Sequence, residues 1–238
     1  MRARRRIALI VLLLGIHLPL HGVWRLVGRR SPWPRRFLRQ VGWAAGVDVR
    51  IVGSAVRRDV LIVANHLSWL DIMILAGASG ARFVAKGEVA RWPVLGFLAG
   101  LNRTVYVSRH QRHAVRAQAA DIRAALAEGQ PVALFAEGTT GDGVGLRPFR
   151  ASLLAALSPP LPRVVMQPVA LDYGADAPRL AWGDTGIGEE MMRVMGLPGR
   201  RTVVVRFLAP IDPAASDDRK ALALHAERQI AAALASGD

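Results

Sequence analysis

Short apolar runs separated by longer segments of mixed polarity recur from residue 48 to the end of the chain. Runs of about four to eight residues rich in Val, Ile, Leu and Phe, bounded by turn or polar residues, are typical of buried strands. They predict strands at residues 48–53, 60–64, 82–86, 104–107, 131–135, 164–171 and 202–208. The intervening segments predict helices at residues 69–77, 94–101, 109–127, 149–157 and 216–235. Strands that alternate with helices predict an α/β fold, a single domain with a mainly parallel sheet flanked by helices.

The pattern is different in the first 47 residues. Residues 7–20 are apolar apart from His17, and a weaker apolar stretch extends to Val27. A helix that spans a bilayer needs about 20 apolar residues, and this run is interrupted by His17, Pro19 and His21. We therefore predict a helix that lies in one leaflet. A single-pass anchor is an alternative, and a signal peptide is a weaker one because no small-x-small cleavage site precedes the next arginines.

The distribution of charge indicates an anionic binding partner. The formal net charge is +14, and residues 1–50 hold eleven arginines against one aspartate, so +10 of the excess lies at one end. Arginines on both sides of the apolar run favour the cytoplasmic face of the inner membrane for both ends, with Trp24, Trp33 and Trp43 at headgroup depth. Nucleic acid is not an expected partner, because the arginines alternate with an apolar run and not with stacking aromatics.

We accordingly expect two parts, a basic membrane-anchoring segment at residues 1–47 and the α/β domain at residues 48–238. The chain has no cysteine, which excludes disulfides and thiolate chemistry. The pair His110-x-x-His113 has the spacing of metal ligands on a helix, but no third ligand accompanies it, so no metal is expected.

The strongest chemical signal is the spacing of His66 and Asp71. His66 follows the apolar run 60–64, and Asp71 comes five residues later, where the next apolar run begins. Five residues rotate a straight helix by about 140°, so the two side chains can meet only if His66 lies in the loop and Asp71 in the first helical turn. The carboxylate would then orient the imidazole and make His66 a general base.

A second interpretation of the same stretch is purely structural. Ser68-x-x-Asp71 has the form of a capping box, in which the Ser68 hydroxyl accepts a free backbone N–H at the start of the helix. Ser68 is also beside His66, but no Gly-x-Ser-x-Gly turn surrounds it, so a capping role is favoured over that of a nucleophile.

Further polar groups follow other strands. In open α/β sheets ligands bind beyond the carboxyl ends of the strands, which brings Lys86, Arg109 and the loop Glu137-Gly138-Thr139 into consideration. Glycine beside a hydroxyl residue can turn backbone N–H groups toward an anion, although an ordinary turn would look the same.

Taken together, these stretches resemble the lysophospholipid acyltransferase family, which includes 1-acylglycerol-3-phosphate acyltransferase. The family's four blocks are similar, in order and spacing, to residues 65–71 (Asn-His-Leu-Ser-Trp-Leu-Asp), 106–109 (Tyr-Val-Ser-Arg), 135–140 (Phe-Ala-Glu-Gly-Thr-Thr) and 167–169 (Gln-Pro-Val). Phe83-Val-Ala-Lys86 and Trp92-Pro93 also match the family's pattern. The resemblance covers residues 60–172.

The resemblance implies transfer of an acyl group from a thioester, on acyl carrier protein or coenzyme A, to a lysolipid hydroxyl. It makes His66 the base and Asp71 its orienting acid, with no cofactor beyond the thioester substrate. It makes Lys86, Arg109 and the Glu137-Gly138-Thr139 loop binders of the acceptor's polar head.

Three positions depart from the family's pattern near the expected headgroup site: Ser108, Ala136 and Thr140. Lysophosphatidate is the first acceptor that the resemblance implies, and a lyso-ornithine or related amino-acid lipid is the alternative. Outside the family, the alternatives are a non-catalytic membrane-surface binder and a lipid hydrolase.

Overall fold

A computed structural model gives the fold, and it describes residues 1–28, 31–87, 96, 99–100, 104–107, 112–183, 185–216 and 218–237. Seven strands form one sheet in the order β1-β7-β6-β2-β5-β3-β4. Neighbouring strands are parallel except β6 and β7, which are antiparallel. The strands are β1 (Val47–Val52), β2 (Val60–Ala64), β3 (Arg82–Lys86), β4 (Val105–Val107), β5 (Val132–Phe135), β6 (Val165–Asp172) and β7 (Arg201–Phe207). The predicted α/β fold with a mainly parallel sheet is confirmed.

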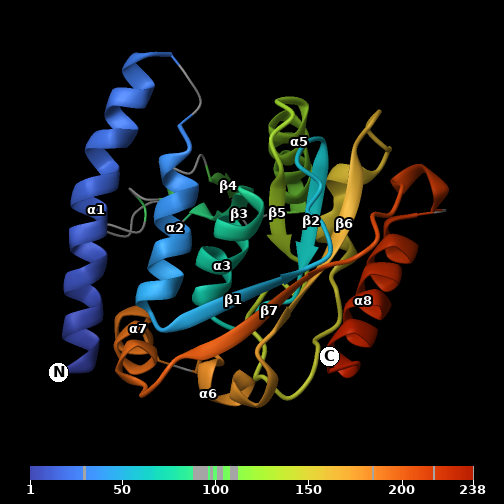
Figure 1. Cartoon of the computed structure of the whole chain (residues 1–238). Helices are drawn as coiled ribbons and strands as arrows, with labels where there is room; N and C mark the ends of the chain where they lie inside the picture. Colours follow the sequence, from blue (N-terminus) through green and yellow to red (C-terminus); the bar gives the residue numbers. More distant parts are fainter. Residues whose placement is uncertain are drawn as a thin grey trace.

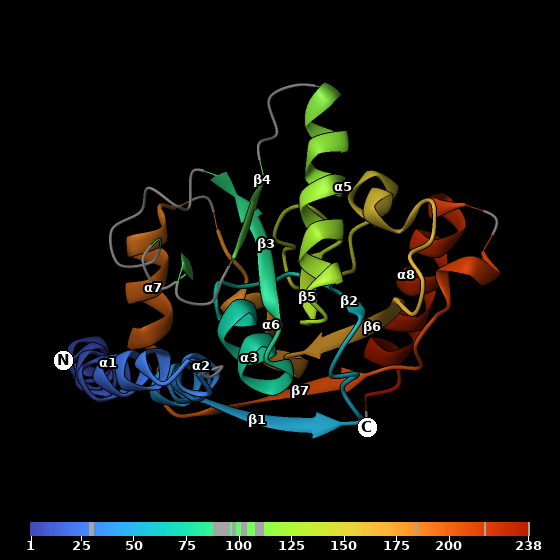
Figure 2. The same cartoon turned by 90° about the horizontal axis from the view of Figure 1, so that it is seen from above.

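Helices cover both faces of the sheet (Figures 1 and 2). The α-helices are α1 (Arg2–Leu26), α2 (Trp33–Ala44), α3 (Leu70–Ser79), α5 (Arg112–Ala127), α6 (Ala177–Leu180), α7 (Ile187–Gly196) and α8 (Arg219–Ala235). Three 3₁₀ turns complete the described elements: η2 (Ala151–Leu157), η3 (Gly174–Asp176) and η4 (Pro213–Ala215). Residues 149–157 were predicted to be α-helical; they instead form the short η2, which ends before Pro159 and Pro160.

The central strand β2 shows how the sequence builds the two cores. Val60, Ile62 and Ala64 point into the core beneath α2, α3 and α7. Leu61 and Val63 point into the opposite core, beneath α5, η2 and α8. All five residues are completely buried, because side chains alternate between the faces of a strand and both faces of a parallel sheet are covered.

The N-terminal segment packs against the domain. Helix α1 lies beside α2 along one side of the molecule (Figures 1 and 2) and also contacts α7. The guanidinium of Arg6 donates to the carbonyl oxygens of Met195, in the last turn of α7, and of Leu197 and Gly199, just beyond it. The buried face of α2 lies on α3, so α2 belongs to the same core as the sheet.

Helix α1 continues through the positions that were expected to interrupt it. Pro19 lies inside the helix, and His17 is buried with its Nδ1 atom 2.8 Å from the Leu13 carbonyl oxygen. The His17 ring packs edge-on against Trp33 of α2, with the ring centroids 5.5 Å apart. These residues join the two helices. The result is a 25-residue helix that is long and apolar enough to cross a membrane.

Helices α7 and α8 differ from the sequence analysis. Helix α8 was predicted to begin at a Ser216 cap, but the cap is Asp218, whose side chain accepts from the backbone N–H groups of Lys220 and Ala221. Helix α7 was not predicted, because its ten residues contain two glycines and follow Gly186. The predicted helix at residues 94–101 lies mostly outside the described residues, as do Trp92 and Pro93.

Candidate active site

Two neighbouring parallel strands end beside one another and supply the polar groups of the site. Strands β2 and β5 pair in register up to Ala64 and Phe135. Asn65 and His66 follow β2, and the Glu137-Gly138-Thr139 loop follows β5. The Gly141 N–H donates to the His66 carbonyl oxygen at 2.7 Å, so the second loop folds over the first. The carboxyl ends of the strands therefore gather these groups, as predicted for an open α/β sheet.

His66 and Asp71 are in direct contact. His66 Nδ1 lies 2.7 Å from Asp71 Oδ2. Asp71 occupies the first turn of α3 and is completely buried, whereas 17% of the His66 side chain remains exposed. An ionised carboxylate only accepts hydrogen bonds, so the proton is on Nδ1 and the Nε2 lone pair is free. The structure thus brings the predicted pair together in the geometry of an oriented general base.

The same carboxylate oxygen shapes the loop between the two residues. Asp71 Oδ2 also accepts from the backbone N–H groups of Leu67 at 2.6 Å and Ser68 at 2.8 Å. The Ser68 hydroxyl was expected to cap α3, but it is buried and has no hydrogen-bond partner among the described residues. The prediction of a Ser68 cap was therefore wrong. The Asp71 N–H, which a Ser68 cap would accept, donates instead to the Ser68 carbonyl oxygen at 3.1 Å. Asp71 Oδ2 does accept the Ser68 N–H, as the acid of a capping box does.

An aromatic side chain fixes the plane of the His66 ring. The Phe135 ring lies parallel to it, with centroids 3.9 Å apart and an interplanar angle of 7°. Phe83 packs on the far side of Phe135 at 5.5 Å. Since the Asp71 contact fixes one edge of the imidazole and Phe135 covers one face, the remaining freedom of His66 is small.

Glu137 is a buried support for the His66 loop. Its Oε1 accepts from the His66 N–H at 2.7 Å and its Oε2 from the Arg147 N–H at 3.2 Å. Only 3% of Glu137 is exposed. Burial raises the pKa of this carboxyl more than the two N–H donors lower it. Its predicted contact with an acceptor lipid stays a prediction; in the structure both oxygens serve the protein backbone.

The rest of this loop places an arginine near the surface. Gly138 has a φ of +72°, which favours glycine, and a Cβ atom there would lie 3.1 Å from Arg150 Cδ, a tight contact with a flexible side chain. The chain returns to β5 when the Arg150 N–H donates to the Ala136 carbonyl oxygen at 2.9 Å. Thr139 and Arg150 are exposed at this turn. The loop that buries Glu137 therefore also exposes a threonine and an arginine.

Two of the predicted site residues cannot be placed. Arg109 lies outside the described residues, and of Lys86 only the backbone, in β3, is described. Their predicted contact with an acceptor stays a prediction. His110 and the His113 side chain are likewise outside what the structure describes, which leaves the expected absence of a metal untested.

Sequence reasoning missed three residues of the site. Tyr173 donates a hydrogen bond to Asp71 Oδ1, Asn65 joins the ends of β2 and β6, and Arg150 lies against Gly138. Tyr173 follows β6, whose carboxyl end is near that of β2. The rule that ligands gather at strand ends would have found it, had it been applied to that strand as well.

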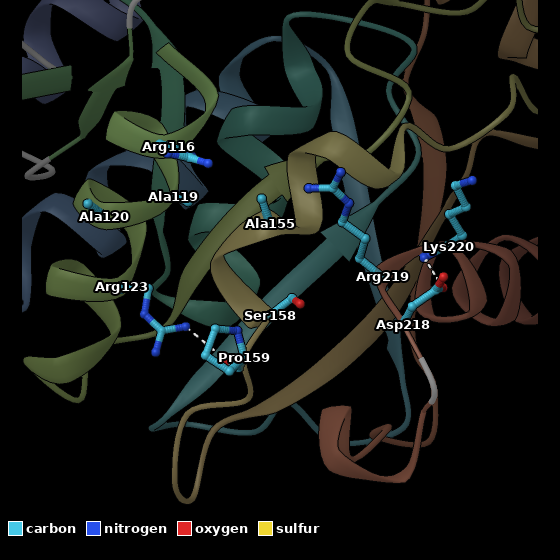
Figure 3. Close-up of a pocket in the computed structure, with 10 residues that line it drawn as sticks. All are labelled: Arg116, Ala119, Ala120, Arg123, Ala155, Ser158, Pro159, Asp218, Arg219 and Lys220. Atoms are coloured by element: carbon cyan, nitrogen blue, oxygen red, sulfur yellow. Dashed lines mark hydrogen bonds between the residues drawn. The ribbon is translucent and has the colours of Figure 1, made fainter. Parts of the chain in front are cut away.

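A basic groove of about 530 Å³ lies between α5, η2 and the start of α8 (Figure 3). Its charged lining comprises Arg116, Arg123, Asp218, Arg219 and Lys220. Arg123 is engaged by the Ala156 and Pro159 carbonyl oxygens. Of the predicted site residues whose side chains the structure describes, none lines this groove.

Comparison with known proteins agrees with this geometry. Residues 48–172 match the family model described as Acyltransferase. The chain is 35% identical to lyso-ornithine lipid O-acyltransferase of Brucella abortus over 227 residues, which cover 87% of this chain and 85% of that protein. It is 34% identical to 1-acyl-sn-glycerol-3-phosphate acyltransferase of Neisseria gonorrhoeae over 180 residues, covering 74% and 69%.

The fold also has a counterpart among solved structures. The 1-acyl-sn-glycerophosphate acyltransferase of Thermotoga maritima superposes with a TM-score of 0.69 at 20% identity, over 99% of this chain and 97% of that one. At this identity the match shows the fold alone. With the family model covering more than half of the chain, these results establish that the protein is an enzyme of the acyltransferase family.

Proposed function

We propose that this acyltransferase moves an acyl group from a thioester to the free hydroxyl of a lysolipid, with His66 as the general base. The observation that carries the proposal is the contact of His66 Nδ1 with the buried Asp71, which leaves Nε2 as the proton acceptor on a side chain that is 17% exposed. Nε2 takes the proton of the acceptor hydroxyl as its oxygen attacks the thioester carbonyl. The C–S bond then breaks, and the thiolate takes the proton back from His66. No acyl-enzyme and no cofactor are needed.

Asp71 supports both stages of this reaction. Its charge stabilises the imidazolium that forms after the first proton transfer. Because Oδ2 also accepts two backbone N–H groups, the carboxylate cannot turn away from the ring without losing them. Much of the rate would come from holding hydroxyl and thioester in line.

For the acceptor we propose a lyso-ornithine lipid ahead of lysophosphatidate. The sequence analysis put lysophosphatidate first. Lyso-ornithine lipid O-acyltransferases of Brucella abortus and Pseudomonas aeruginosa match 87% and 98% of this chain, a larger share than the 74% matched by the glycerophosphate enzyme of Neisseria gonorrhoeae. Thr140 replaces the arginine common in the third block. An amino-acid head carries one carboxylate, which a single cation such as Arg150 can balance.

We propose that the donor thioester is carried by acyl carrier protein or coenzyme A, and that α1 holds the enzyme on the cytoplasmic face of the membrane. Support for the membrane contact comes from the exposed apolar residues of α1. These are Val11, Leu12, Ile16, Leu20, Val23 and Leu26, each at least 37% exposed. A helix that packs on α2 and α7 along one side and exposes apolar residues on the other suits a position within one leaflet.

The deciding experiment gives the purified enzyme an acyl thioester together with lyso-ornithine lipid in one reaction and lysophosphatidate in another. We expect acylated ornithine lipid as the main product, and no product from His66→Ala. Faster acylation of lysophosphatidate would reverse the order of acceptors. Free fatty acid released without an acceptor would indicate a hydrolase, and full activity of His66→Ala would refute the base.

A further inference from the structure

The Asp71 carboxylate has four hydrogen-bond donors, and one of them comes from a distant part of the chain. Oδ2 accepts from His66, Leu67 and Ser68, all within the same loop. Oδ1 accepts from the hydroxyl of Tyr173, 102 residues later. We propose that Tyr173 is a positioning residue for acyl transfer, whose hydroxyl holds Asp71 in the orientation that keeps His66 Nδ1 protonated and Nε2 free. The inference rests on the proposed role of His66 as base.

The position of Tyr173 is built into the sheet. Strand β2 ends at Ala64, and the Asn65 side chain continues the pairing: its oxygen accepts from the Leu171 N–H at 2.8 Å and its nitrogen donates to the Leu171 carbonyl at 3.0 Å. Leu171 and Tyr173 both lie in the core beneath α3. Asn65 therefore aligns the end of β6, so that the Tyr173 hydroxyl reaches Asp71 Oδ1 while His66 contacts Oδ2.

The surroundings keep the hydroxyl protonated and directed at Asp71. Only 4% of Tyr173 is exposed. Burial raises its pKa well above the ordinary value of 10, and the negative charge of Asp71 raises it further. Tyr173 is thus a neutral donor over the whole physiological range. Phenylalanine would fill the same volume but leave a buried carboxylate oxygen without a partner, which is costly.

The hydroxyl matters because the Oδ2 contacts fix only one end of the carboxylate. With Oδ1 free, Asp71 could pivot about Oδ2, and the negative charge at Oδ1 would have no donor. More of the charge would then face His66, and the protonated imidazole would be favoured. Glu137 is the other acidic group whose charge acts on this site, and its two backbone contacts are independent of Tyr173.

The test compares Tyr173→Phe with the wild type and with Tyr106→Phe, which removes a hydroxyl that donates to the Gly96 carbonyl instead. For Tyr173→Phe we expect kcat to fall about tenfold with little change in KM. The acidic limb of the kcat/KM profile should move to higher pH by about 0.5 to 1 unit. Tyr106→Phe should leave that limb in place.

A double variant shows whether Tyr173 acts by positioning Asp71 or only by packing in the core. If Tyr173 acts through Asp71, then adding Tyr173→Phe to Asp71→Asn should cost about twofold or less. An equal cost in both backgrounds, or a fall in activity with an unmoved acidic limb, would overturn the proposal. Failure of this proposal can be distinguished from failure of the proposed function. A wrong acceptor would appear as a different preferred lysolipid of the wild type, and a wrong base would appear as retained activity of His66→Ala.

Discussion

At the scale of single residues, the site is a set of polar groups whose partners are mostly backbone atoms. Asp71 and Glu137 are both almost fully buried, and both accept N–H groups of the loop that carries His66. The loop is therefore held by two acids. Asp71 belongs to α3, the helix that follows the loop, and Glu137 follows β5, the strand that pairs with β2. This explains how a loop histidine can be as well oriented as one in a regular element.

Glu137 makes the stability of the protein depend on pH. Its pKa is raised in the folded state, so the folded protein holds this proton more tightly than the unfolded chain. The stabilisation is complete below the unfolded value near 4.5 and is lost as the pH rises through the folded value. We expect the unfolding free energy of the wild type minus that of Glu137→Gln to fall over that interval as the pH increases. Urea unfolding of both proteins at a series of pH values measures this quantity, and a rise with pH would contradict the assignment.

Arg150 is the residue that we expect to contact the acceptor head. It is exposed, lies against Gly138 and comes from the loop that also carries Thr139. Arg150→Ala should raise KM for the lysolipid about tenfold while changing kcat less, since a contact to a nonreacting group is made equally before and in the transition state. Arg219→Ala is the matched control, because Arg219 is exposed and lines the separate groove of Figure 3. Equal effects of the two substitutions would exclude a specific role for Arg150.

At the scale of elements, each helix is defined by the face that it buries. Helix α3 packs between α2 and the sheet, and its first turn carries Asp71. It ends at Gly80, whose φ of +76° is left-handed, as the glycines after this segment indicated. Helix α1 is different, because the groups that fix it are the arginines at its start and the contact with α2, while much of its apolar surface is uncovered.

This uncovered surface gives a prediction for α1. Val11→Glu together with Leu12→Glu replaces side chains that are 61% and 60% exposed, so the fold should tolerate both. Charges on a face that contacts lipid are costly, and we expect binding to anionic vesicles to weaken by at least about tenfold. Leu224→Glu on α8, at a side chain 45% exposed, should bind like the wild type. Sedimentation with vesicles measures this, and unchanged binding of the α1 variant would move the membrane contact elsewhere.

At the scale of the whole molecule, the site exists because strands β2, β5 and β6 end together. Of these three strands, β2 and β6 are farthest apart in the sequence, and the Asn65 side chain connects them. Removing its side chain leaves the N–H and the carbonyl of Leu171 without their partners in a buried position. The effect should extend from stability to catalysis, because Tyr173 follows two residues later.

For Asn65→Ala we expect a loss of about 1–3 kcal/mol for each buried group left unpaired, together with a fall in kcat. Asn65→Asp keeps the acceptor for the Leu171 N–H but loses the donor, and its buried charge should cost at least as much stability. Thermal unfolding and steady-state kinetics on the same preparations check both. An unchanged midpoint for Asn65→Ala would show that Leu171 finds other partners.

Short patterns in the amino-acid sequence were enough to predict the strands, the contact of His66 with Asp71 and the family. The apolar runs indicated all seven strands, because buried strands need unbroken apolar sequence when both faces of the sheet are covered. The five-residue spacing of His66 and Asp71 predicted their contact, since only a loop followed by a helical turn brings such residues together. The order of the four blocks indicated the acyltransferase family before any fold was known.

Only the tertiary structure decided which groups complete the site. Tyr173 and Asn65 act through partners more than a hundred residues away, and such contacts follow from strand order, which no local pattern contains. The direction of Glu137 into the protein depends on the His66 and Arg147 N–H groups that the folded loops present to it. The Ser68 hydroxyl does not cap α3, because the Asp71 N–H donates to the Ser68 carbonyl oxygen instead. The sequence thus predicted the contact of His66 with Asp71, and the packing of the strand ends determined what holds the two residues in place.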